Sequence, residues 1–257
     1  MTSAEGAPEA PGRGDGDPAV SPGGGDGSSA VPPGGEDGPA VSLRELGRAY
    51  GERVALAGVT LELPRGATLA VFGANGAGKT TLLRVLATLL RPHRGDVTVL
   101  GRALPREGWA VRGQIGLLGH DPLLYRDLSP RENLRFHARL HDVAFARVEE
   151  LLEAVGMRGR ADDPVQTYSR GMVQRTAVCR AVLHSPALLL LDEPLAGLDP
   201  GAVALVAPLI GSGTRVLISH DVEHGLAEAD LVLGLRGGRV AFLERDVSEA
   251  DVRALYA

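Results

Sequence analysis

The hydrophobic pattern of the chain predicts strands in its first structured part. Residues 40–46 (AVSLREL) and 53–63 (RVALAGVTLEL) alternate apolar and polar positions, which is typical of half-buried strands. Residues 67–73 (ATLAVFG) are almost entirely apolar and end in glycine, which predicts a buried strand followed by a tight turn. Leucine and valine then recur at helical spacing over 82–90, ahead of Pro92, so a helix is expected there.

The remainder of the chain alternates between strand-like and helix-like segments. Short apolar runs predict further strands at 96–101, 114–119, 187–191 and 215–219. Amphipathic runs predict helices at 131–141, 145–156 and 169–184, and a short helix before the last strand. Strands that alternate with helices build a mostly parallel sheet with helices on both faces. The predicted fold class is therefore α/β.

Residues 1–40 differ in composition from the rest. This stretch is rich in Gly, Pro, Asp and Ser. It has seven acidic residues and one arginine, so its net charge is strongly negative. A segment without apolar runs cannot bury enough surface to offset the entropy lost on ordering. We therefore expect a disordered acidic tail over 1–40 and a folded domain over 41–257. The tail lacks the charged and then apolar pattern of a secretory leader.

Composition also limits the compartment and the partners. No stretch approaches the ~20 apolar residues of a transmembrane helix. Cys179 is the single cysteine, which excludes an internal disulfide and fits a reducing compartment. The net charge is −5, and the sequence has no basic stripe of the kind that binds nucleic acid. Nucleic acid is therefore not an expected partner.

The segment GANGAGKTT, at residues 73–81, contains a phosphate-binding pattern. Gly73, four residues and then Gly78-Lys79-Thr80 lie between a predicted strand and a predicted helix. In such a loop the backbone amides and the helix N-terminus face phosphate oxygens, the lysine reaches the β- and γ-phosphates, and the threonine hydroxyl ligates Mg²⁺. Lys79 is the only lysine of the chain. A compact ammonium fits among backbone amides where a wide guanidinium would not.

Two acidic residues follow the predicted strand at 187–191. Asp192 can hold the shell of a Mg²⁺ ion, and Glu193 can polarise a water for attack on a γ-phosphate. A second anion site is predicted at Thr167–Arg175, where Ser169 can cap a helix and leave free amides beyond it. Two γ-phosphate sites are needed if two subunits face each other and each closes the nucleotide of the other.

Together these motifs resemble the ATPase subunits of ABC transporters. The phosphate loop, YSRGM, LLLLDEP, GLDP and ISHD occur in the order and approximate spacing of that family, from Val41 to about Arg239. The resemblance implies a P-loop NTPase core of the ABC nucleotide-binding type, an antiparallel β-subdomain and a helical subdomain near 120–185. It also implies ATP and Mg²⁺ as ligands, and a dimer that hydrolyses ATP to ADP and phosphate.

The resemblance assigns a role to each matching residue. Tyr50 would stack on adenine, and a stacked aromatic ring contributes about 1–3 kcal/mol. Asp192 would hold Mg²⁺ and Glu193 would be the catalytic base. His220 would contact the γ-phosphate and the attacking water, and Asp199 would couple the two sites of the dimer. The loop residues implied in nucleotide binding are Gly73, Ala74, Asn75, Gly76, Ala77, Gly78, Lys79, Thr80 and Thr81. The signature residues implied to meet the γ-phosphate across the dimer are Tyr168, Ser169, Arg170, Gly171 and Met172.

Two positions depart from the family pattern. His120 stands where the family normally has a glutamine that touches Mg²⁺ and the membrane partner, and a neutral imidazole could still hydrogen-bond the waters of the ion. The segment from Asp199 to His220 is about five residues shorter than usual and contains Pro208 inside the expected helix. A proline inside a helix removes a hydrogen bond, so a truncated or kinked helix is expected.

His120 also favours one subfamily. The stretch LGHDPLLYRDLSPRENLRFHARLH resembles the ATPase subunit of the haem exporter of cytochrome c maturation, in which a GH pair takes the place of the glutamine. A drug or lipid exporter ATPase that lost its glutamine is the alternative. The ATPase itself is not expected to contact haem. The other histidines are expected to be surface or packing residues: His93, His137, His141, His184 and His224.

The resemblance implies that the chain acts at a membrane without entering it. It would bind a separate transmembrane permease subunit from the cytoplasmic face of a bacterial cell membrane. A non-transport ABC ATPase of translation or DNA repair is a second hypothesis. Such proteins carry tandem ATPase domains or long coiled-coil insertions, and neither is present in this sequence.

Overall fold

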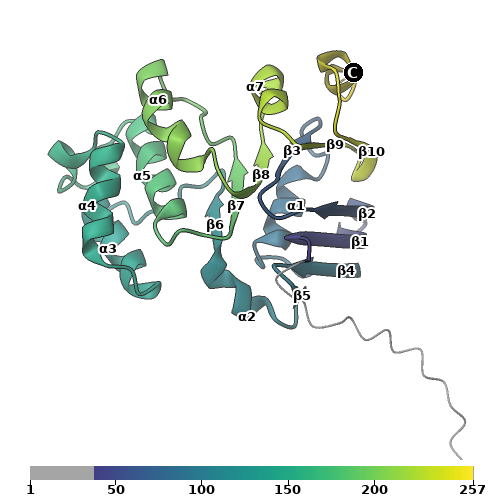
Figure 1. The fold of residues 1–257 in the computed structure, drawn as a ribbon, viewed down its shortest axis with the longest axis horizontal. Coiled ribbons are helices and arrows are strands. Elements are labelled where there is room, and N and C mark those ends of the chain that lie inside the picture. Colours follow the sequence, from purple (N-terminus) through teal and green to yellow (C-terminus); the bar gives the residue numbers. More distant parts are fainter. Residues whose placement is uncertain (1–37, 257) are drawn as a thin grey trace, which may run out of the picture. The chain divides into compact units, whose positions relative to one another are not determined.

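The computed structural model describes residues 38–256, and its strands form two sheets (Figure 1). The larger sheet has the strand order β10-β9-β3-β8-β7-β6, and its neighbours are parallel except for the antiparallel pair of β9 and β10. The α/β fold with a mostly parallel sheet is therefore confirmed. The strands are β3 (Thr68–Phe72), β6 (Ile115–Leu118), β7 (Leu188–Asp192), β8 (Thr214–Ile218), β9 (Leu231–Arg236) and β10 (Arg239–Glu244).

Strand β7 shows why these segments are apolar throughout. Leu188 and Leu190 pack into one hydrophobic core together with residues of β3 and the phosphate-loop helix. Leu189 and Leu191 pack into a second core, which is built from helical residues such as Leu151. Successive side chains of a strand point to opposite faces of the sheet. Both faces of this sheet are thus covered, as is usual for parallel sheets.

The smaller sheet is antiparallel and has the order β2-β1-β4-β5. Ala40 extends the pairing of its first strand, because its buried amide donates to the Leu63 carbonyl at 2.8 Å. Ala40, which the prediction placed in the tail, thus joins the sheet, and the rest of the tail predicted at 1–40 lies almost wholly outside the described residues. The strands are β1 (Val41–Tyr50), β2 (Arg53–Leu63), β4 (Arg94–Val99) and β5 (Arg102–Leu104).

Three helices pack against one another beyond the edge of the larger sheet, in the teal and green part of Figure 1. Buried residues of these helices, including Leu134, Leu152 and Val178, share one core with Leu118 of β6. A capping box begins the first of them, since Ser129 accepts from the Glu132 amide. The helices of this part are α3 (Pro130–Leu140), α4 (Phe145–Ala154) and α5 (Arg170–Val182).

The other helices contact one of the two sheets or another helix. They are α1 (Lys79–Leu86), α2 (Gly108–Val111), α6 (Pro200–Ile210), α7 (Val222–Ala227) and α8 (Glu249–Arg253). Helix α6 runs through Pro208 and ends at Ile210, so the proline lies in its last turn rather than ending the helix. No helix within residues 38–256 is both long and apolar enough to cross a membrane.

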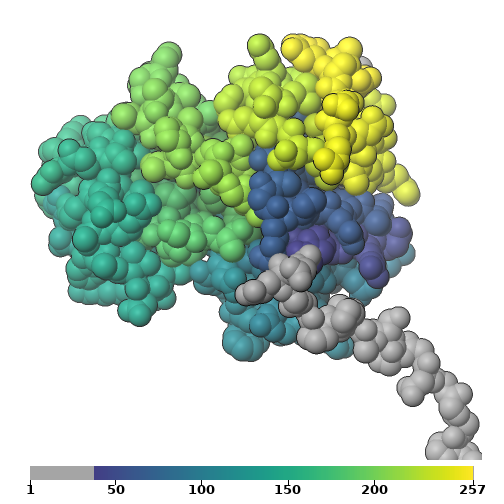
Figure 2. All heavy atoms as spheres, in the orientation of Figure 1, coloured from purple at the N-terminus to yellow at the C-terminus, as the bar shows by residue number. Residues whose placement is uncertain are grey.

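The C-terminal strands lie beside strands from the N-terminal part of the described chain. Strand β9 pairs in parallel with β3, and β10 contacts β2 of the smaller sheet. Figure 2 shows the C-terminal residues in yellow next to the N-terminal strands in blue and purple. The phosphate loop that follows β3 is therefore enclosed by segments from both ends of the sequence.

Candidate functional site

The loop between β3 and α1 curls through backbone conformations that require glycine. Gly73, Gly76 and Gly78 have φ angles of 147°, 83° and 108°. A Cβ atom on Gly78 would clash with the carbonyl oxygen of Ala55, and one on Gly73 would clash with that of Leu235. The loop is thus pressed against β2 and β9. Helix α1 begins directly after Gly78 without a side-chain cap, so its first amides are free to meet an anion.

Lys79 occupies the inside of this loop. Its buried Nζ donates to the carbonyl oxygens of Gly73 at 2.5 Å and of Ala74 at 3.3 Å. Burial lowers the pKa of the Lys79 ammonium from its ordinary value, while the nearby carboxylates of Asp192 and Glu193 oppose the shift. The single lysine of the chain is therefore held as a compact cation among backbone groups.

Asp192 ends β7 next to the start of α1. The Thr80 hydroxyl donates to Asp192 Oδ2 at 3.3 Å. A hydroxyl and a carboxylate are hard oxygen donors, which Mg²⁺ prefers, and Mg²⁺ completes its shell with waters and phosphate oxygens. Within the described part of the chain, no group of three or more His, Cys, Asp or Glu residues could hold a metal by itself. Thr80 and Asp192 thus fit an ion that arrives with a nucleotide.

Glu193 lies directly beyond the strand and is held in an unusual backbone conformation. Its φ angle is 52°, and its amide donates to the Ile218 carbonyl at 3.0 Å. Its side chain is 27% exposed, and its buried Oε1 has no hydrogen-bond partner among the described residues. Burial, and next the carboxylate of Asp192, raise the pKa of Glu193 to about 7. A carboxylate with this pKa can take up and release a proton near neutral pH.

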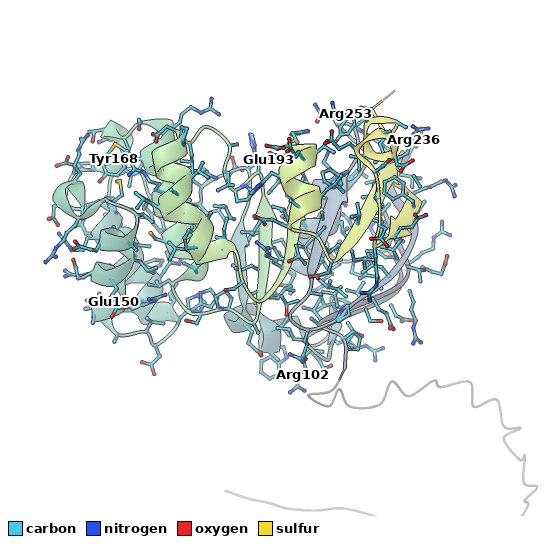
Figure 3. All side chains as sticks on the ribbon, turned by 45° about the horizontal axis from the view of Figure 1, so that its top comes forward. Arg102, Glu150, Tyr168, Glu193, Arg236 and Arg253 are labelled. Atoms are coloured by element: carbon cyan, nitrogen blue, oxygen red, sulfur yellow. The ribbon has the colours of Figure 1, made fainter. Side chains whose placement is uncertain are left out.

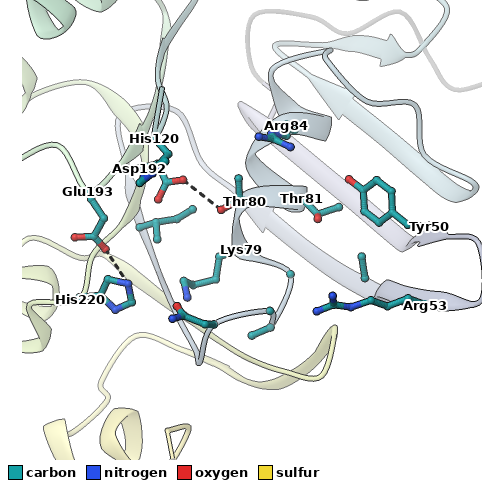
Figure 4. Close-up of a pocket in the computed structure, with 16 residues that line it drawn as sticks. Tyr50, Arg53, Lys79, Thr80, Thr81, Arg84, His120, Asp192, Glu193 and His220 are labelled. Atoms are coloured by element: carbon teal, nitrogen blue, oxygen red, sulfur yellow. Dashed lines mark hydrogen bonds and ion pairs between the residues drawn. The ribbon is translucent and has the colours of Figure 1, made fainter. Parts of the chain in front are cut away.

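His220 faces Glu193 from the end of the neighbouring strand. Its Nε2 lies 3.7 Å from Glu193 Oε1, which is longer than a hydrogen bond (Figure 4). The imidazole is half exposed, at 54%. A water or a phosphate oxygen could therefore contact both side chains at once.

These residues surround one pocket of about 540 Å³ (Figure 4). Its lining brings together most of the residues that the sequence pointed to, although they come from five separate segments. Gly73 and Ala74 do not line it but lie beneath it and accept the hydrogen bonds of Lys79. The lining residues are Tyr50, Arg53, Ala55, Asn75, Gly76, Ala77, Gly78, Lys79, Thr80, Thr81, Arg84, His120, Asp192, Glu193, Ile218 and His220.

The rim of the pocket near Tyr50 holds two arginines that the sequence analysis missed. Tyr50 is 43% exposed and pairs with Arg53 across the β1–β2 hairpin. Arg84 reaches the pocket from α1. Neither Arg53 nor Arg84 forms an ion pair with a described residue. The hairpin pairing was a signal for Arg53, because directly opposed residues of a hairpin lie close together.

His120, which follows β6, also lines this pocket. Its side chain is exposed, and it lies beside Asp192 in Figure 4. Apart from His120 and His220, no histidine of the described residues lines the pocket. Two of the others, His141 and His184, stack ring on ring with centroids 4.1 Å apart, and His224 contacts Glu228.

The predicted signature residues and Asp199 lie elsewhere. Ser169 caps α5 by accepting from the Met172 amide at 3.3 Å, and Ser169 and Arg170 are exposed. Asp199 caps α6 through the Ala202 amide and is also exposed. None of the residues from Tyr168 to Met172 lines the pocket. Figure 3 shows Tyr168 among the helices and Glu193 over the larger sheet.

The sequence is similar to ATP-binding proteins of ABC transporters. Residues 56–196 match the family model described as ABC transporter. The chain is 40% identical over 210 residues to the daunorubicin resistance ATP-binding protein DrrA3 of Streptomyces coeruleorubidus, covering 78% of this chain and 66% of that protein. It is 41% identical over 177 residues to the cytochrome c biogenesis ATP-binding export protein CcmA of Methylococcus capsulatus, covering 66% of this chain and 86% of that protein.

A solved structure supports the same comparison. It is titled as the structure of the ATP-binding subunit of an ABC transporter, and it matches 84% of this chain and 98% of its own chain. The TM-score is 0.76 at 26% sequence identity. The similarity thus extends over both sheets and the helices between them.

Proposed function

The chain belongs to the ABC transporter ATP-binding family, and we propose that it hydrolyses ATP to ADP and phosphate to drive a separate membrane-spanning subunit. The observation that carries the proposal is the position of Glu193. Its carboxylate stands beside the phosphate loop, 3.7 Å from His220, with a pKa of about 7. A general base works best when its pKa lies near the operating pH.

Binding of the nucleotide is assigned to the loop side of the pocket. The amides of residues 75–81 and the start of α1 would face the phosphates, with Lys79 between the β- and γ-phosphates. Tyr50 would stack on adenine at the exposed rim. Arg53 and Arg84, which form no ion pair with described residues, would add positive charge near the phosphates or the base.

The chemistry is assigned to the strand-end side. Mg²⁺, held by Thr80 and Asp192, would offset charge on the phosphate oxygens. Glu193 would accept a hydrogen bond from the attacking water and take its proton. His220 would hold the same water or the γ-phosphate in place, because it faces Glu193 across the gap described above.

A dimer is proposed because the signature residues do not reach the pocket of their own chain. Ser169 and Arg170 are exposed at the start of α5, where a helix N-terminus would attract an anion. In a head-to-tail dimer they would meet the γ-phosphate bound by the partner. Asp199, exposed at the start of α6, would lie between the two sites.

The test is Glu193→Gln in the full chain. This variant should retain ATP binding, measured by calorimetric titration, because the loop and Tyr50 are unchanged. Turnover, measured as phosphate release, should fall about 10²–10⁴-fold, as expected for loss of a general base. Unchanged turnover would remove Glu193 from this role.

The cargo is proposed to be haem or a haem carrier in the assembly of c-type cytochromes. His120 in the pocket and the covered length of the cytochrome c biogenesis protein support this proposal. The ATPase would dock on a permease at the cytoplasmic face of a bacterial membrane. The comparable identity to a daunorubicin resistance protein supports a drug exporter as the second candidate. Both relatives are named for export or resistance, which favours transport over the translation and repair alternative.

Deletion of the gene in its host separates the two cargo candidates. Loss of c-type cytochromes on haem-stained gels, restored by the wild-type gene but not by Glu193→Gln, would support the haem pathway. Normal cytochromes together with new sensitivity to an anthracycline would support drug export instead. Copurification of a permease with the tagged chain would identify the membrane partner directly.

A further inference from the structure

A buried arginine lies within the larger sheet, away from the nucleotide pocket. Arg215 stands near the start of β8, and its side chain is only 7% exposed. It forms an ion pair with Glu228 Oε2 at 2.8 Å. Ionised side chains are rarely buried unless they are paired. Among the ion pairs of the described residues, none contains a more buried arginine.

The guanidinium of Arg215 binds more than its acidic partner. Its Nε donates to Thr68 Oγ1 at 2.9 Å, and its Nη1 donates to the carbonyl oxygen of Ile210 at 3.0 Å. Ile210 is the last residue of α6, so the cation meets the negative end of that helix. Glu228 follows the last residue of α7. One side chain therefore joins the sheet to the C-terminal ends of two helices.

The other ends of the same helices carry residues with proposed roles in hydrolysis. Helix α6 begins after Asp199, which caps it. Helix α7 begins after Asp221, which caps it and directly follows His220. A helix is a rigid element, so fixing its C-terminal end restricts where its first turn lies. The two helices that begin next to Asp199 and His220 therefore both end at contacts with Arg215.

Glu228 is itself held in a fixed orientation. Its Oε2 binds Arg215, while its Oε1 lies 3.1 Å from Nε2 of His224 on the preceding turn of α7. Both carboxylate oxygens are therefore occupied. The carboxylate connects the body of α7 to the sheet through Arg215.

We infer that the Arg215–Glu228 pair is a positioning device for ATP hydrolysis, which holds α7 with His220 and α6 with Asp199 in one fixed arrangement over β8. The inference rests on the proposed function, because it assumes the roles of His220 and Asp199. Neither Arg215 nor Glu228 lines the nucleotide pocket. Loss of the pair should therefore affect the rate of turnover and leave the binding of ATP unchanged.

The experiment compares Arg215→Met, Glu228→Leu and the double variant in the full chain. Each single variant leaves one charge without its partner and should lower the melting temperature. The double variant removes both charges, and apolar replacement of a whole buried pair is often neutral or stabilising. Turnover, KM and ATP affinity are measured at a temperature where circular dichroism shows every variant folded. In the double variant kcat should fall about tenfold, since small misplacements of reacting groups cost up to about a hundredfold, and KM and ATP affinity should stay unchanged.

The control is Arg131→Met with Glu149→Leu, two residues that also pair with Asp162 and Arg135 respectively. This ion pair joins α3 and α4, and its side chains are 17% and 35% exposed. Its removal should leave kcat unchanged. A double variant at Arg215 and Glu228 with the kcat of the wild type, or an equal fall of kcat in the control, would overturn the inference. Absence of turnover in the wild type would instead overturn the proposed function, so the two failures are distinguishable.

Discussion

The raised pKa of Glu193 predicts that Glu193→Gln is more stable than the wild type, by an amount that depends on pH. The pKa rises from an ordinary value of 4.5 to about 7 in the folded chain, and the side chain is mostly buried. The folded state therefore holds this proton more tightly than the unfolded state. As the pH rises from 4.5 to about 7, ionisation favours unfolding, and a glutamine does not ionise.

The size of the effect follows from the two pKa values. The wild type should be less stable than the variant by about 1 kcal/mol at pH 5 and about 3 kcal/mol at pH 7, where the difference levels off. For a chain of this size about 3 kcal/mol corresponds to roughly 6–12 °C in melting temperature. The assay is thermal unfolding of both proteins without nucleotide, followed by circular dichroism from about pH 5 to about pH 8.

Glu244→Gln is the control, because Glu244 is exposed at the end of β10 and forms no ion pair with a described residue. Its melting temperature should follow that of the wild type at each pH. A difference between Glu193→Gln and the wild type that is the same at all pH values would refute the reasoning. So would a variant that is less stable near neutral pH, because burial would then not penalise the ionised carboxylate.

Two further substitutions test the binding side of the pocket. Lys79→Arg should weaken ATP affinity or turnover although the charge is kept, because a planar guanidinium does not fit between the carbonyls of Gly73 and Ala74; normal affinity in calorimetry together with normal phosphate release would contradict this. Tyr50→Ala should raise KM for ATP about 5–150-fold with little change in kcat, which corresponds to the ~1–3 kcal/mol of a stacked base. Tyr50→Phe keeps the ring and should behave like the wild type, so an equal loss in steady-state kinetics of both variants would argue against stacking.

The buried strands of the larger sheet were predictable from the sequence, whereas its two C-terminal strands, β9 and β10, were not. Residues 188–192 are buried on both faces of the sheet, and a continuous apolar run in the sequence indicates such burial directly. Strands β9 and β10 escaped prediction although they complete the same sheet. Gly234 lies within β9, and its lack of a side chain makes room for the Phe242 ring of β10. A glycine that admits a neighbouring ring looks like a strand breaker until the pairing is known.

The candidate site also contains some residues that the sequence could predict and others that it could not. The phosphate loop could be located because its residues are contiguous and its glycines reflect a local backbone requirement. Arg84 could not be located, because an isolated arginine carries no pattern in a chain that is rich in arginine. The pKa of Glu193 depends on burial and on Asp192, and burial becomes visible only when β7 and β8 are paired.

The choice between lysine and arginine follows the geometry of the acceptors in this protein. Lys79 and Arg215 are the two buried basic residues of the described chain. Lys79 donates to two neighbouring backbone carbonyls, which a compact point charge can do while it still faces an incoming phosphate. Arg215 reaches a hydroxyl, a helix-end carbonyl and a carboxylate on three different elements, which requires donors spread over a rigid plane. Arginine, which this chain uses almost throughout, therefore suits position 215. The two neighbouring acceptors at position 79 explain why one lysine is present.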